Sequence, residues 1–224
     1  MADADNPKTV VCFGDSITWG FDPSEGANFV RFGFAERWTR RLQTELGNGY
    51  HVIEEGLSGR TAVFDDPVLG GMSGLADLPN TLKTHMPVDL LVIMLGSNDL
   101  KRRFAITADE IARALGRVVE AAATSTCGPE GKAPKILVLV PPNVGEIEKT
   151  FIGTWFDGDT ARTASRQLSE TYPPIAAAFG AECFDMSKIV GPGKIDGLHL
   201  DADQLEPFAM ALAPVVRRLL KPDG

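Results

Sequence analysis

Cysteines and basic residues are scarce in this sequence of 224 residues, and long apolar runs are absent. The three cysteines, Cys12, Cys127 and Cys183, are too few and too scattered for a disulfide framework, so we expect a reducing, cytoplasmic location. No stretch approaches the roughly 20 consecutive apolar residues of a membrane-spanning helix. The N-terminal MADADNPKT carries acidic residues where a signal peptide has basic ones, and no apolar segment follows it.

Charge of one sign dominates, because 22 lysines and arginines stand against 30 aspartates and glutamates, for a net charge of −8. Phosphate backbones and anionic lipids recruit clusters of lysine and arginine, so we expect neither nucleic acid nor membrane as a partner. Hydrophobic residues make up 44% of the chain, as in ordinary globular proteins. The length suits one domain over residues 1–224, with residues 1–7 as a flexible N-terminal tail.

Five short apolar runs predict strands buried on both faces, as parallel strands covered by helices are. They cover residues 9–13, 51–54, 90–95, 136–140 and, more weakly, 182–185. Helical patterns lie between and after them, over residues 34–46, 75–84, 107–119, 160–179 and 205–219. Pro173 and Pro174 conflict with the fourth helix, while Pro207 and Pro214 predict a late start or a kink in the last. The alternation predicts one open, mostly parallel sheet with helices on both faces.

Short polar or glycine-containing segments follow the predicted strands, where ligands bind in sheets of this class. They are residues 14–16 (Gly-Asp-Ser), 55–61, 96–99 (Gly-Ser-Asn-Asp) and 196–199 (Asp-Gly-Leu-His). Ser16 could be a nucleophile, but a serine hydroxyl needs a neighbouring base to take its proton. Of the three histidines, His51 and His85 are expected at the opposite end of the sheet. His199 is therefore the candidate base.

The other parts of an acyl-transfer site are present in the same segments. Asp196 can accept a hydrogen bond from His199 Nδ1–H, which would fix the tautomer and stabilise the imidazolium. The backbone N–H groups of Ser16 and Gly59 and the side-chain amide of Asn98 are candidate donors to an oxyanion. Each residue also has a plainer interpretation as a helix cap, a turn glycine, a strand-end turn or a solvated loop histidine.

Gly14-Asp15-Ser16, Gly59, Gly96-Ser97-Asn98-Asp99 and Asp196-Gly197-Leu198-His199 resemble, in order, the four motif blocks of the SGNH (GDSL-type) serine hydrolases. "FGDSITWG", "VIEEGLSGRT" and "DLLVIMLGSND" are most similar to the bacterial arylesterase/acyltransferase and carbohydrate acetylesterase branch. Ile17, where the family name implies leucine, and Glu54-Glu55, where many relatives have asparagine, depart from the pattern.

The resemblance implies a single flavodoxin-like three-layer α/β/α domain with a five-stranded, mostly parallel sheet. It implies Ser16 as nucleophile, His199 as base, Asp196 as its partner, and an oxyanion hole formed by Ser16, Gly59 and Asn98. The implied substrates are small-molecule esters with short acyl groups, either aryl esters or acetylated carbohydrates. A homo-oligomer is also implied, since relatives include octamers.

Two residues near the serine, Asp15 and Trp19, are assigned to substrate binding, although Trp19 could equally be a core-edge aromatic. The segment 151–156 could be core, a lid or a subunit contact. Asp65-Asp66 lacks the Cys and His of a zinc site, and we predict no metal and no cofactor. Besides a serine esterase, an acyltransferase and a catalytically silent binding module remain open. FMN also binds at this edge of flavodoxin-like sheets, but acidic Asp15 disfavours phosphate there.

Overall fold

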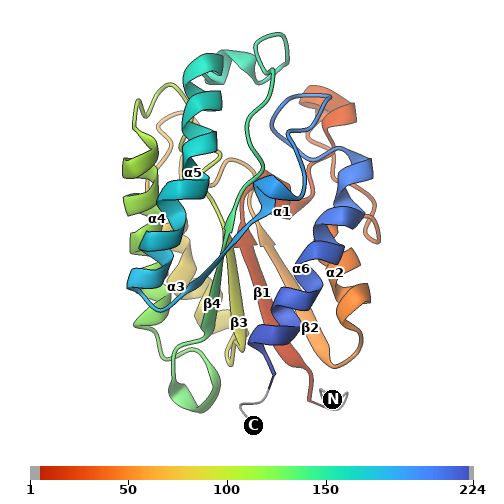
Figure 1. The fold of residues 1–224 in the computed structure, drawn as a ribbon, viewed down its shortest axis with the longest axis vertical. Helices are drawn as coiled ribbons and strands as arrows, with labels where there is room; N and C mark the ends of the chain where they lie inside the picture. Colours follow the sequence, from red (N-terminus) through yellow and green to blue (C-terminus); the bar gives the residue numbers. More distant parts are fainter. Residues whose placement is uncertain (1–5, 222–224) are drawn as a thin grey trace.

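A sheet of five parallel strands in the order β2-β1-β3-β4-β5 runs through the protein (Figure 1). The computed structural model describes residues 6–221. The strands are β1 (Lys8–Gly14), β2 (Tyr50–Gly56), β3 (Leu90–Met94), β4 (Lys135–Val140) and β5 (Glu182–Asp185). All five predicted strands are thus confirmed, and every pair of neighbours is parallel. Of the expected tail at 1–7, residues 1–5 lie outside the described residues.

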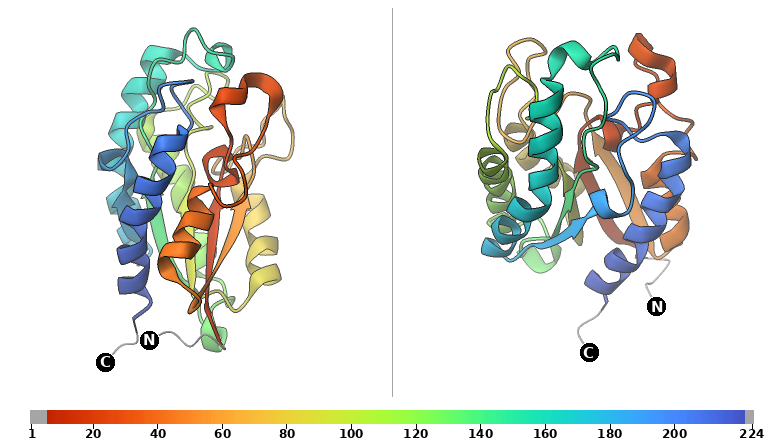
Figure 2. Two further views of the ribbon diagram at one scale, coloured as in Figure 1. Left: turned by 90° about the vertical axis from the view of Figure 1, so that its right-hand side faces the viewer. Right: turned by 45° about the horizontal axis from the view of Figure 1, so that its top comes forward.

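The central strands are apolar on both sides because helices cover both faces of the sheet. In β1, the side chains from Val10 to Phe13 are at most 1% exposed. The α-helices are α1 (Ser16–Trp19), α2 (Trp38–Leu46), α3 (Gly74–His85), α4 (Ala108–Ala123), α5 (Gly158–Ala178) and α6 (Leu205–Leu219). α3, α4 and α5 form one hydrophobic core with the sheet, and α2 and α6 form the other (Figures 1 and 2). This is the expected three-layer α/β/α arrangement.

Two helix boundaries differ from the sequence-based expectations. The helix expected from residue 34 begins at Trp38, because the carboxylate of Glu36 accepts the N–H of Gly33 in a turn, and Phe34 is 66% exposed. Of the late start and the kink expected for the last helix, the late start is wrong, since α6 runs from Leu205 to Leu219. Pro207 falls in its first turn, where the N–H groups have no partner within the helix in any case.

The order of the strands creates a crevice at the carboxyl edge of the sheet. The chain goes from β1 to β2 on one side and then returns across β1 to β3 on the other. The loops that follow β1 and β3 therefore diverge, which is the topological switch point at which such sheets bind ligands. Ser16 follows β1 and Asn98 follows β3, so both lie at this point.

Two further properties concern the described part of the chain. Within residues 6–221, no helix combines the length and the apolar character that a bilayer-crossing segment requires. Cys12, Cys127 and Cys183 are free thiols, as their spacing in the sequence indicates.

Candidate active site

The serine lies on a tight turn between β1 and the short helix α1. β1 ends at Gly14, and Ser16 is the first residue of α1. Asp15 caps this helix, because its carboxylate accepts the N–H of Ile17 at 3.0 Å. A Cβ at residue 14 would lie 2.2 Å from Thr18 Oγ1, so only glycine lets the helix fold back onto the strand end. The turn holds Ser16 at the carboxyl edge of the sheet.

A chain of hydrogen bonds joins Ser16, His199 and Asp196. Ser16 Oγ lies 2.8 Å from His199 Nε2, and His199 Nδ1 lies 2.5 Å from Asp196 Oδ2. Since a carboxylate accepts from Nδ1–H, the network assigns the tautomer in which Nε2 is free to accept the serine proton. Burial alone would raise the pKa of Asp196, but the hydrogen bond and charge of His199 outweigh it and lower that pKa. The carboxylate therefore stays ionised and can stabilise an imidazolium.

The turn that carries His199 is held by its own backbone. Asp196 Oδ1 accepts the N–H groups of Leu198 and His199 at 2.9 and 2.8 Å. Gly197 has a φ of +76°, and a Cβ there would lie 2.7 Å from the carbonyl oxygen of Glu146. The Gly197 carbonyl in turn accepts the N–H of Gly145 at 2.7 Å. The turn is thus docked on the segment after β4, which fixes the direction of the imidazole.

Three hydrogen-bond donors face the same cavity as the serine. They are the N–H of Ser16, the N–H of Gly59 and the amide of Asn98, and all three residues line the cavity with His199. Neither backbone N–H donates to another group within residues 6–221. Asn98 Nδ2 donates to Asp15 Oδ2 at 3.4 Å, so the nitrogen of the amide, and not its carbonyl oxygen, faces the serine turn. Donors already in place could stabilise negative charge as it develops on a substrate oxygen.

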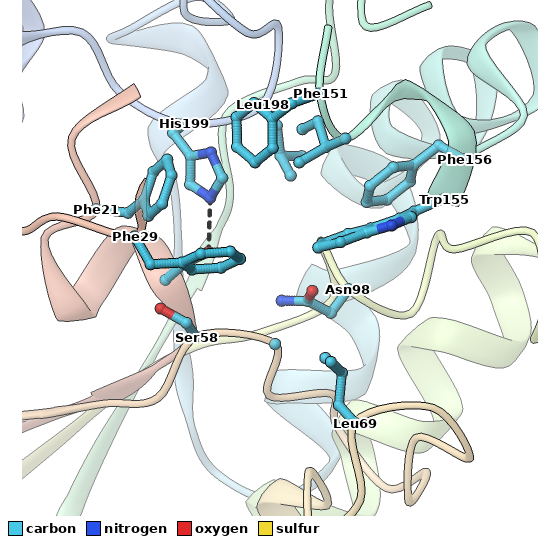
Figure 3. A pocket seen from close by; sticks show the side chains of 13 residues that line it. Phe21, Phe29, Ser58, Leu69, Asn98, Phe151, Trp155, Phe156, Leu198 and His199 are labelled. Atoms are coloured by element: carbon cyan, nitrogen blue, oxygen red, sulfur yellow. Dashed lines mark hydrogen bonds between the residues drawn. The ribbon is translucent and has the colours of Figure 1, made fainter. Parts of the chain in front are cut away.

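The cavity itself is small and largely apolar (Figure 3). Its volume is about 90 Å³, compared with roughly 300–1,000 Å³ for sites that bind drug-sized ligands. The polar lining consists of Ser16, Ser58, Gly59, Asn98 and His199, and the apolar lining of Phe21, Phe29, Leu69, Phe151, Ile152, Trp155, Phe156 and Leu198. Such a site fits a compact, uncharged ligand with one polar group to be recognised.

The structure places the two residues assigned to substrate binding elsewhere. Trp19 is not among the lining residues, and its ring is covered by the guanidinium of Arg31, 4.9 Å from the ring centroid. Asp15 is 1% exposed and also outside the lining, so its contacts are with Ile17 and Asn98. The wall expected from Trp19 is formed by other aromatic side chains.

One aromatic wall stands beside the imidazole. The ring of Phe21 lies 4.3 Å from that of His199, measured between centroids, and 5.9 Å from that of Phe151. Phe29 completes this group at 5.8 Å from Phe21. Phe29 has a left-handed backbone, with a φ of +53°, and nothing in the sequence indicates that this exposed loop residue turns back to the site. Of the roles considered for residues 151–156, core is confirmed for Ile152 and Phe156, each 1% exposed. The segment also lines the cavity, a role that the sequence does not suggest.

Buried charges support the turns around the cavity. Both oxygens of Asp99 lie 3.1 Å from the N–H of Ala62, and burial, reinforced by the charge of Asp15, raises the pKa of Asp99 to about 7. The guanidinium of Arg60 joins the ends of β1 and β2, since it donates to the carbonyl oxygens of Gly14 and Glu55 at 2.9 and 2.6 Å. The Glu55 carboxylate lies 2.7 Å from His85 Nε2.

Comparisons with known proteins find similar sequences and similar folds. Residues 12–207 match the GDSL-like lipase/acylhydrolase family. A carbohydrate acetylesterase from Sinorhizobium meliloti is 38% identical, with a TM-score of 0.89 over 95% of this chain and 100% of its own. The aryl esterase of M. smegmatis is 37% identical, with the same TM-score and the same coverage of both chains. Among curated protein sequences, none matches.

Proposed function

The chain belongs to the GDSL-like lipase/acylhydrolase family, the SGNH hydrolases, and on that premise we propose that it is a serine esterase for short-chain acyl esters. One observation carries the proposal. The hydrogen-bonded chain from Asp196 through His199 to Ser16 opens into a small apolar cavity that also holds three oxyanion donors.

The proposed reaction passes through an acyl-enzyme on Ser16. His199 Nε2 takes the hydroxyl proton while Ser16 Oγ forms a bond to the ester carbonyl carbon. The carbonyl oxygen becomes negative and is stabilised by the donors of Ser16, Gly59 and Asn98. The imidazolium then gives its proton to the departing alkoxide, and the carbon–oxygen bond of the ester breaks. Water, deprotonated by His199, releases the acid and restores Ser16.

The two sides of the cavity have different parts in this reaction. His199 must reach the leaving oxygen to protonate it, so the alcohol lies on the side of His199 and Phe21. The acyl group then extends the other way, toward Leu69 and Trp155, which Figure 3 shows across the cavity from the imidazole. The small volume favours acetyl and other short acyl groups. The names of the two relatives, a carbohydrate acetylesterase and an aryl esterase, support acetylated sugars or small aryl esters as substrates.

An acyltransferase is the second candidate, and the apolar lining favours it. Aromatic walls beside His199 hold an alcohol more readily than water, so an alcohol could resolve the acyl-enzyme. Adding increasing ethanol to an ester assay separates the two functions. Formation of ethyl ester at the expense of free acid would indicate transfer, and unchanged acid release would indicate hydrolysis. A silent binding module fits less well, because it would have no use for the complete hydrogen-bonded chain.

We also propose that the protein acts as a cytoplasmic homo-oligomer, octameric as its resemblance to such esterases implies. Exposed apolar side chains near the mouth of the cavity support subunit contacts there. Phe29 is 51% exposed and Val68 is 71% exposed. Analytical ultracentrifugation of the purified protein would measure the number of subunits in the oligomer.

The deciding experiment compares wild type with Ser16→Ala on p-nitrophenyl acetate, butyrate and octanoate. We expect acetate to be hydrolysed fastest and the alanine variant to lose at least about 10³-fold in kcat/KM. Ser169→Ala, on α5 and outside the cavity lining, is the matched control and should keep the wild-type rate. A Ser16→Ala variant with a wild-type rate would overturn the nucleophile, and a wild type inert on every ester would overturn the esterase.

A further inference from the structure

A buried lysine with no part in the hydrogen-bonded chain lies behind the cavity. The Nζ atom of Lys101 lies 3.0 Å from Asp66 Oδ2, and neither side chain has any exposed surface. Burial lowers the pKa of Lys101, an effect that Asp66 opposes. Because a buried ion pair contributes little net stability over apolar residues of similar size, the pair calls for another explanation.

Asp66 organises the turn that carries one wall of the cavity. Its Oδ1 accepts the N–H groups of Val68 at 2.9 Å and Leu69 at 3.3 Å. Its carbonyl oxygen accepts the N–H of Gly70 at 2.7 Å, and the guanidinium of Arg103 donates to Oδ1 at 2.8 Å. The turn presents Leu69 to the cavity, beside Gly59. The carboxylate of Asp66 therefore determines where Leu69 lies.

Lys101 belongs to two other segments that line the cavity. Its N–H donates to the carbonyl oxygen of Asn98 at 3.2 Å, which closes the turn after β3. Its backbone also pairs with Phe156 in an isolated antiparallel bridge, and its Nζ lies 5.8 Å from the centroid of the Trp155 ring. Lys101 is thus the point at which the segments of Leu69, Asn98 and Trp155 are joined.

We propose that the Asp66–Lys101 ion pair sets the width of the acyl side of the cavity, and so the preference for short acyl groups. Both are positioning residues, since neither lines the cavity. This inference rests on the proposed esterase function. The pair suits the task because its two charges attract strongly in a dry site and, together with Arg103, hold the loop after β2 against the loop after β3. When the ion pair is removed, Leu69 and Trp155 can move apart. The wider cavity then admits longer acyl chains and binds the acetyl group less firmly.

The test is the selectivity ratio, kcat/KM for p-nitrophenyl acetate divided by kcat/KM for the hexanoate ester. This ratio does not depend on how much of a preparation is active, so loss of stability alone leaves it unchanged. In Lys101→Met and Asp66→Asn we expect it to fall about tenfold, since displacement of substrate-positioning groups by an ångström has effects of this size or larger. Arg117→Met, which removes an exposed ion pair with Glu120 on α4, is the control and should leave the ratio unchanged.

A double variant provides the test if the single variants fail to fold. Asp66→Leu/Lys101→Met replaces the pair with apolar side chains, a change that buried sites often accept. It should fold and show the same lowered ratio. An unchanged ratio in a folded variant, with wild type active, would overturn the inference and leave the esterase intact. A wild type inactive on both esters would instead overturn the proposed function on which the inference depends.

Discussion

The side chain of Leu69 packs against the α-carbon of Gly59, so that a Cβ at residue 59 would lie 2.8 Å from Leu69 Cδ1. Gly59 also has a φ of +96°, a left-handed conformation that L side chains rarely adopt. The N–H of Gly59 is one of the three candidate oxyanion donors. Its position therefore depends on the absence of a side chain.

Gly59→Ala is expected to lower kcat for p-nitrophenyl acetate by about 10²-fold, because the strained backbone withdraws one oxyanion donor. KM should change much less. Gly180→Ala is the matched control, since Gly180 also has a positive φ, of +71°, but a Cβ there meets nothing within 4 Å. Equal losses in the two variants would show that backbone strain, and not the donor, is responsible.

Asp196→Asn should lower kcat by about 10³–10⁴-fold with little change in KM. An amide cannot fix the Nδ1–H tautomer as a carboxylate does, nor stabilise the imidazolium. Steady-state kinetics on the acetate ester measures both constants. Asp203→Asn, at a largely exposed position a few residues further along, should behave as wild type. A loss below tenfold in Asp196→Asn would mean that His199 is not oriented by this carboxylate.

Asp99 makes stability depend on pH. Burial raises its pKa from 3.8 to about 7, so the folded protein holds this proton more tightly than the unfolded chain does. Its contribution to the free energy of unfolding is therefore full below about pH 4 and is lost as pH rises through about 7.

Asp99→Asn has no proton to lose at this position, so its stability relative to wild type should increase as pH rises. We expect its Tm relative to wild type to increase between pH 4.5 and pH 8 by at least about 2–4 °C, the shift that about 1 kcal/mol produces in a chain of this size. Thermal unfolding followed by circular dichroism at the two pH values measures it. A constant difference in Tm would show that Asp99 keeps the same charge throughout this range.

Tyr172→Phe tests the hydrogen bond that holds the chain just after β3. The hydroxyl of Tyr172 is fully buried and donates to the carbonyl oxygen of Leu95 at 2.9 Å, in space left free by Gly96. Its loss should lower the free energy of unfolding by about 1–2 kcal/mol. Since Tyr172 does not line the cavity, kcat/KM should stay within about twofold of wild type. Urea unfolding measures the first quantity. Tyr50→Phe, at the start of β2, is the control, and an equal loss there would contradict the assignment.

The parts of the protein that the sequence predicts well are those set by local patterns. Each strand is a short apolar run, and parallel strands bring the loops after them to one edge of the sheet, so Ser16, Asn98 and His199 could be expected to meet. The structure brings them together around one cavity. The same reasoning places the helix after residue 34 too early, because Phe34 fits the helical spacing although Glu36 and Gly33 form a turn.

The walls of the cavity depend on contacts between loops that are far apart in the chain, and local sequence patterns do not predict such contacts. Trp19, the last residue of α1, is the natural choice for a wall, but Phe21 and Phe29 occupy that place through an irregular loop. The doublet Asp65-Asp66 suggests at most a weak metal pair. The partner that explains Asp66, Lys101, is 35 residues further along the chain.

The distance along the chain between Ser16 and His199, 183 residues, has a consequence for protein synthesis. A ribosome completes β1 and the serine turn early, but the imidazole proposed to activate the serine is made only after all five strands. Throughout elongation, the growing polypeptide thus carries an alcohol no more reactive than any surface serine. By the proposed mechanism, the protein hydrolyses no ester until its fold is almost complete, and the onset of esterase activity in a translation reaction would report when the loop of His199 reaches its place.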